Sequence, residues 1–179
     1  MSANTATIRE AEEAIKRRLI ADAFRGTFEY APDKVIETDR WWYIPFCWLG
    51  CAGFIVSKDD LYVNWLGSAL TLEHCFWGHD HGVFCDLVDF GFSPDTDRTL
   101  AARLLLRFKH MHPNARGVRP SEPVWYEESE IPAALSSAFP TFSRHFVWFS
   151  IPELRHAYEN DGLRFTCGLP RAGALSLGR

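Results

Sequence analysis

The sequence lacks several features that would assign it to a functional class at once. It has no run of about 18 apolar residues, so it predicts no membrane-spanning helix. Residues 1–7 contain neither a basic segment nor an apolar run, which predicts the absence of a secretory signal peptide. Phosphate-binding glycine loops, nucleophile elbows, zinc-protease motifs and nucleotide-binding fingerprints are also missing. We therefore expect a soluble, cytoplasmic protein whose motifs indicate no particular reaction.

The sequence is also short of paired cysteines and of strong net charge. The 179-residue chain has five cysteines, an odd number that argues against a secreted disulfide scaffold and favours reduced, mostly buried thiols. Its formal net charge is only −4, so the overall electrostatic field selects neither nucleic acid nor a membrane as a partner. The five cysteines mentioned above are Cys47, Cys51, Cys75, Cys85 and Cys167.

Aromatic residues, by contrast, are abundant. They make up 15% of the chain, with seven Trp, and they crowd segments 41–56 and 61–67 on either side of a short polar break. Aromatic and β-branched residues in this arrangement predict a sheet hairpin around an aromatic core. A chain of this length buries about 70% of the surface that its unfolded form exposes. We expect one domain over residues 1–170 and a flexible tail at 171–179.

The patterns along the chain predict an α+β fold. Thr7 and Glu10 form a capping-box pattern ahead of an amphipathic helix. An antiparallel meander is expected to follow through residue 66, and strand-helix units through the second half, including a helix over residues 94–111. The predicted architecture is therefore an N-terminal helix on a mainly antiparallel sheet, extended by strand-helix units.

Residues that could act as metal ligands or nucleophiles concentrate in segment 74–85. If this segment is extended, His79 and His81 share one face, whereas if it is helical, Cys75 and His79 lie one turn apart. Two ligands do not make a zinc centre, which needs three or four, so we predict neither a metal nor another cofactor. An enzyme of unknown reaction that uses cysteine and histidine residues of this segment is the alternative function.

Charge is segregated in the second half of the sequence. Residues 98–119 include six basic residues and no acidic ones, whereas residues 121–130 include four glutamates and no basic residue. One interpretation is that the two segments pair with each other. Alternatively, the acidic segment binds a basic protein partner, or the basic segment contacts nucleic acid. Because the net charge is negative and no nucleic-acid-binding module is recognised, we favour a protein partner and place nucleic acid third.

The first half of the chain also resembles a known family. A Trp-rich strand at 41–46, an apolar strand with a Lys-Asp turn at 51–60, and Leu-Gly-Ser at 66–68 followed by Leu-Glu at 72–73 resemble the small bacterial immunity proteins of the YrhB-like group. The resemblance covers roughly residues 8 to 80. It implies a toxin inhibitor that acts by protein–protein interaction and is not an enzyme, and it assigns no binding residue.

The predicted function is a cytoplasmic protein-binding module, most specifically an immunity protein that occludes the active surface of a cognate toxin. Such interfaces are typically held by a few aromatic or arginine anchors inside a polar rim. No residue is assigned a catalytic role. The candidate partner-binding residues are Trp77, His79, Asp80, His81, Glu127, Glu128 and Glu130.

Overall fold

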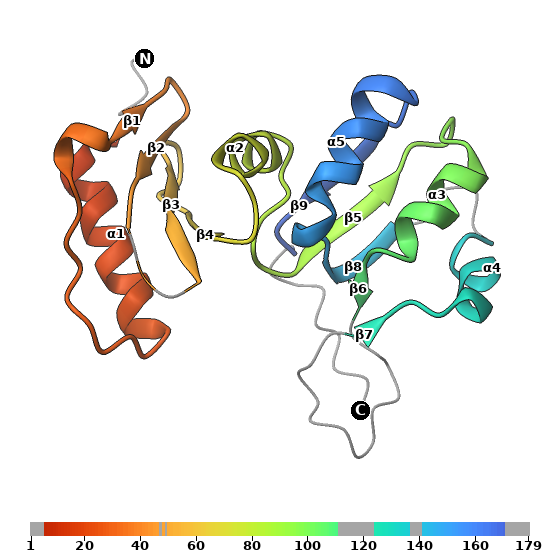
Figure 1. The fold of residues 1–179 in the computed structure, drawn as a ribbon, viewed down its shortest axis with the longest axis horizontal. Coiled ribbons are helices and arrows are strands. Elements are labelled where there is room, and N and C mark those ends of the chain that lie inside the picture. Colours follow the sequence, from red (N-terminus) through yellow and green to blue (C-terminus); the bar gives the residue numbers. More distant parts are fainter. Residues whose placement is uncertain (1–5, 47, 49, 111–123, 137–140, 171–179) are drawn as a thin grey trace. The chain divides into compact units, whose positions relative to one another are not determined.

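The chain combines helices and antiparallel sheets in an α+β fold, as the sequence predicts. It divides into two compact units, Met1–Leu72 and Glu73–Arg179, and each is described by itself (Figure 1). The prediction of a single domain over residues 1–170 stays a prediction, and the predicted tail at 171–179 lies outside the described residues. A computed structural model describes residues 6–46, 48, 50–110, 124–136 and 141–170.

The first unit is a helix packed on a four-stranded antiparallel sheet of order β1-β2-β3-β4. The predicted N-terminal helix and the antiparallel meander are both confirmed. The elements are α1 (Ile8–Ala21), η1 (Pro32–Lys34), β1 (Ile36–Glu37), β2 (Trp41–Ile44), β3 (Cys51–Ser57) and β4 (Val63–Gly67).

A capping box begins α1. The backbone N–H of Glu10 donates to the Thr7 hydroxyl at 3.3 Å, and the backbone N–H of Thr7 donates to the Glu10 carboxylate at 2.7 Å. These bonds satisfy backbone donors that the first turn of a helix leaves open. Ile15 and Leu19 are buried on one face of α1 in the same apolar cluster as Phe54 of β3. The aromatic segment found in the sequence therefore supplies the core of this unit.

The second unit has a five-stranded sheet of order β7-β6-β8-β5-β9, in which every described pairing is antiparallel. Helices α3 and α5 lie side by side (Figure 1). The elements are α2 (Leu72–Asp80), β5 (Val88–Phe92), α3 (Arg98–Leu105), β6 (Lys109–His110), β7 (Val124–Trp125), η2 (Glu128–Glu130), α4 (Ile131–Ala134), β8 (Thr141–Phe146), η3 (Trp148–Ser150), α5 (Ile151–Asn160) and β9 (Phe165–Gly168).

The helix predicted over residues 94–111 is shorter at both ends. Asp97 caps it, because its carboxylate accepts the backbone N–H of Leu100 at 2.9 Å, so the helix begins later than predicted. At the other end, residues 109–110 pair with β7 and β8 instead of continuing the helix. Sheet hydrogen bonds between residues distant in sequence therefore override the helical spacing of apolar residues. Of the two geometries left open for segment 74–85, the structure has the helix, α2.

Candidate functional site

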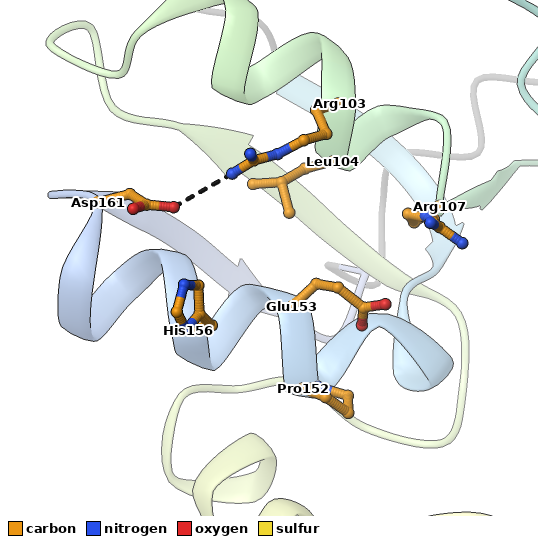
Figure 2. Close-up of a pocket in the computed structure, with 7 residues that line it drawn as sticks. All are labelled: Arg103, Leu104, Arg107, Pro152, Glu153, His156 and Asp161. Carbon is orange, nitrogen blue, oxygen red and sulfur yellow. Dashed lines mark hydrogen bonds and ion pairs between the residues drawn. The ribbon is translucent and has the colours of Figure 1, made fainter.

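A groove runs between α3 and α5 in the second unit, with a cavity volume of about 500 Å³ (Figure 2). Arg103 of α3 and Arg107, two residues after the helix ends, line one side of the groove. Glu153 and His156 of α5 form the opposite wall. The groove is lined by Arg103, Leu104, Arg107, Pro152, Glu153, His156 and Asp161.

Local sequence explains why the two helices meet here. Leu104 of α3 and Leu154 of α5 are both buried, so each helix turns an apolar stripe inward and leaves charged residues at the groove. Pro152 occupies the first turn of α5, where the missing N–H costs no hydrogen bond. The Ser150 hydroxyl donates to the carbonyl oxygen of Arg107 at 2.7 Å and ties the start of α5 to the end of α3.

An ion pair crosses the groove. Arg103 Nη2 lies 3.1 Å from Asp161 Oδ2, and the two side chains are 67% and 37% exposed (Figure 2). Both residues also line a second hollow of about 400 Å³. An exposed pair of this kind contributes about 0–1 kcal/mol, because water and salt screen it. The ion pair therefore adds little to the stability of the unit.

At its other end the groove continues into a third hollow of about 290 Å³, next to β7. Trp125 and Phe149 line this hollow and are 49% and 48% exposed, which is unusual for large aromatic side chains. Lys109 Nζ lies 4.7 Å from the centroid of the Trp125 ring, and this cation–π contact helps to hold the exposed ring in place. Because β7 is the edge strand of the sheet, the Trp125 ring is presented at the rim of the unit.

The predicted acidic segment follows β7 directly. Glu127 and Glu128 are exposed, as a partner-binding role requires. Glu130 is only half-exposed, because its carboxylate accepts the backbone N–H of Glu127 at 2.8 Å and lies 3.7 Å from His110 Nε2. We call Trp125, Phe149, Glu127 and Glu128 together the Trp125 surface.

The other predicted group lies on α2 and just after it. His79 is buried, with its ring 5.4 Å from that of Phe84, so it offers little to a partner. Trp77 and His81 stack on each other at a centroid distance of 4.1 Å and are half-buried. Of the four candidates, Asp80 alone is exposed. Three of the four side chains thus contact other rings, and the partner-binding role of the group stays a prediction.

The structure does not bring the two predicted groups together. The Trp77 ring contacts Phe165 of β9 at 6.2 Å, at one edge of the sheet. Glu127 follows β7, at the opposite edge. Four strand spacings of about 4.8 Å separate the two edges, or roughly 19 Å. A single compact site cannot contain both groups, and the groove and the exposed aromatic residues are on the Glu127 side.

Burial disfavours the thiolate form of two cysteines. Among the described residues, Cys51, Cys75, Cys85 and Cys167 form no disulfide, and Cys47 lies outside the described residues. Burial raises the pKa of Cys75 to about 11 and that of Cys167 to about 12, whereas a reactive cysteine needs a lowered pKa. Within the described part of the chain, no three His, Cys, Asp or Glu side chains are arranged to hold a metal ion.

Sequence reasoning missed a cluster of ring side chains on the sheet face opposite the Trp125 ring. His110 of β6 and His145 of β8 are directly opposite each other in the sheet and are both buried. The Tyr126 ring stacks on His110 at 4.1 Å, and its hydroxyl lies 2.7 Å from His145 Nε2. Burial, together with the Glu130 charge, raises the pKa of Tyr126 to about 12, so its hydroxyl keeps its proton. The histidines are 35 positions apart, and no sequence pattern pairs their strands.

The interpretation that the basic and acidic segments pair with each other can be compared with the structure for only some of their residues. Across the described ranges, no ion pair joins the basic residues of 98–109 to the glutamates of 127–130. Arg103 pairs instead with Asp161, and Lys109 lies over Trp125. The remaining charged residues of this prediction, Arg116, Arg119 and Glu122, lie outside the described residues.

Comparisons with known proteins add no assignment to this geometry. No family model, curated protein or solved structure matches the chain. Among the helices that the structure describes, none has the length and apolar character needed to cross a lipid bilayer.

Proposed function

We propose that this chain is a cytoplasmic protein-binding module, and specifically an immunity protein that neutralises a cognate bacterial toxin by occluding its active surface. The observation that carries the proposal is that two half-exposed aromatic residues, Trp125 and Phe149, line one hollow at the end of a groove. Exposed aromatic side chains next to a hollow are the usual anchors of protein interfaces, because burying them on binding removes a large apolar area from water.

The charges next to these anchors favour a basic partner surface. Glu127 and Glu128 are exposed immediately after β7 and form no ion pair with another described residue. Acidic side chains at the rim of an interface steer a basic partner and speed its association. The Trp125 surface thus fits a toxin that presents basic residues around an apolar contact.

The test begins with capture of a stoichiometric partner from the lysate of the source cells by the tagged chain. The captured protein is then expressed alone and together with this chain. Growth arrest by the captured protein, relieved by co-expression, supports the immunity function. A captured protein that is not toxic, or a toxic one that this chain does not neutralise, overturns it.

Three variants test whether the partner binds at the Trp125 surface. Removal of an aromatic anchor typically costs about 2 kcal/mol or more, so we expect Trp125→Ala to weaken the complex about thirtyfold. Trp48→Ala is the matched control, because Trp48 is 50% exposed and lies in the first unit. The double variant of Glu127→Lys and Glu128→Lys should mainly slow association. Equal effects of Trp125→Ala and Trp48→Ala would move the interface elsewhere.

A further inference from the structure

Two opposite charges lie where the groove between α3 and α5 meets the hollow lined by Trp125 and Phe149. Arg107 and Glu153 each line both the groove and this hollow, so they mark the junction between the two. Both residues are exposed, and neither forms an ion pair with the other or with another described residue (Figure 2). The junction therefore offers an unpaired cation on one wall and an unpaired anion on the other.

The backbone fixes the positions from which these two side chains project. The backbone N–H of Arg107 donates to the carbonyl oxygen of Leu104 at 2.9 Å, and the carbonyl oxygen of Arg107 accepts the Ser150 hydroxyl at 2.7 Å. Glu153 lies in the first turn of α5, which begins directly after Ser150. The same serine thus ties the two walls together before any ligand is present, and this pre-organisation lowers the entropic cost of binding.

The charges that line the groove disfavour a ligand of one sign. Glu153 and Asp161 repel the phosphates of a nucleic acid strand, which gains its affinity from basic side chains. Arg103 and Arg107 repel a purely basic segment. A ligand that carries one anionic and one cationic group beside an apolar group is complementary to the whole junction.

A peptide in an extended conformation carries such groups in a suitable arrangement. Successive side chains of an extended chain point to opposite sides, so two neighbouring residues reach opposite walls of a groove. In a helix, neighbouring side chains are about 100° apart and do not face opposite ways. A further residue with an apolar side chain reaches the hollow lined by Trp125 and Phe149, which are 49% and 48% exposed and gain from being covered.

We propose that the junction binds an extended peptide segment of the partner, which places an acidic side chain on Arg107, a basic side chain on Glu153 and an apolar side chain in the hollow. That this segment belongs to a toxin rests on the proposed function. Recognition of a peptide at the junction does not, because it depends only on the residues that line the groove and the hollow.

The test uses the full chain and needs no toxin. The probe is a phage-displayed library of random peptides of about twelve residues, long enough to span the groove when extended. The library is selected for binding to the chain, and the affinities of the selected peptides are measured by calorimetry. We expect these peptides to share an apolar residue close to one acidic and one basic residue. Failure to select any peptide, or selection of peptides without charged residues, overturns the proposal.

Charge reversal at the junction identifies the residues involved. Arg107→Glu should lower the affinity of a selected peptide about tenfold or more, and exchange of the acidic residue of the peptide for lysine should restore it. Glu153→Lys should have the same effect, reversed by an acidic residue in place of the basic one. Arg98→Glu is the matched control, because Arg98 is an exposed arginine of α3 outside the lining of the groove. Equal effects of Arg107→Glu and Arg98→Glu contradict the proposal.

A single-stranded oligonucleotide is measured in parallel, because exposed aromatic rings beside arginines also stack on bases. The probe is polyuridine of about twelve nucleotides, enough for the site size of a typical single-strand-binding module. We expect no binding at physiological salt. Oligonucleotide binding that Arg107→Glu weakens more than Arg98→Glu does, in a chain that selects no peptide, overturns the peptide assignment in favour of nucleic acid.

The two proposals fail separately. Peptides that bind through Arg107, in a chain that neutralises no toxin, leave the peptide-binding junction standing and remove the immunity function. A neutralised toxin whose complex is unchanged by Arg107→Glu, and with which no selected peptide competes, supports the immunity function and overturns binding of the toxin at the junction.

Discussion

Gly53 is the position in the first unit where adding a single methyl group should be most damaging. Gly53 lies at the irregularity in the pairing of β3 with β4 and has a φ of +139°, which side chains rarely adopt. A Cβ added there would lie 2.7 Å from the carbonyl oxygen of Ile44 and 2.7 Å from Cε2 of Tyr43. The Tyr43 ring cannot easily move away, because its hydroxyl donates to the carbonyl oxygen of Ala52 at 2.9 Å.

The expected loss of unfolding free energy in Gly53→Ala is the sum of the backbone strain and the steric clash. A non-glycine residue in this backbone region costs about 1–3 kcal/mol, and overpacking against a fixed neighbour costs about 1–3 kcal/mol more. We therefore expect Gly53→Ala to lower the free energy of unfolding by about 2–6 kcal/mol. Gly50→Ala is the matched control: Gly50 has a φ of +81° but no atom within 4 Å of the added Cβ. Its expected cost is about 1 kcal/mol, from backbone strain alone.

Urea unfolding of the two variants checks this prediction: the urea concentrations at the unfolding midpoint are compared, provided that the slope of the free energy of unfolding against urea concentration is the same for both. Because the chain has two compact units, hydrogen exchange of the β2 and β3 amides is measured alongside, so that loss of the first unit is seen directly. The reasoning is refuted if Gly53→Ala and Gly50→Ala destabilise the protein equally, because the close approach of β2 would then have no energetic consequence.

Two further predictions concern the second unit. Trp148 is fully buried, whereas its neighbour Phe149 is 48% exposed. Trp148→Ala should therefore lower the free energy of unfolding by about 3–5 kcal/mol, and Phe149→Ala by less than about 1 kcal/mol. Thermal unfolding of the two variants checks this difference. The raised pKa values of Cys75 and Cys167 mean that, above about pH 9, the folded chain binds more protons than the unfolded chain. Stability should then fall as the pH rises above 9, and Cys75→Ala should flatten that fall in a pH series of urea unfolding curves.

The parts of the fold that could be predicted from the sequence are those controlled by near neighbours. The helix that begins after Thr7 is one example, because its capping box involves residues three positions apart. The end of α3 is the opposite case. Apolar spacing continues the helix to residue 111, but Lys109 pairs with Trp125 and Phe146, which are 16 and 37 positions away. No local pattern in the sequence reports those hydrogen bonds.

The candidate site likewise has some features that the local sequence predicts and others that depend on the whole fold. Glu127 and Glu128 could be predicted because a run of like charges is usually exposed. The burial of His79 could not be predicted, because a histidine in a short helix gives no local sign of which face is buried, and the structure packs it against Phe84. The pairing of His110 with His145 depends on strand order, which is a property of the whole sheet.

The three glutamates of segment 127–130 show why composition alone could not define this site. Glu127 and Glu128 are exposed and available to a partner, whereas Glu130 is held between the turn and His110. Charge reversal at the first two positions should therefore change association and leave the fold intact. Loss of the Glu130 side chain should instead destabilise the turn, because its carboxylate accepts the backbone N–H of Glu127. Identical side chains within four residues thus have separable roles, because one of them holds the turn.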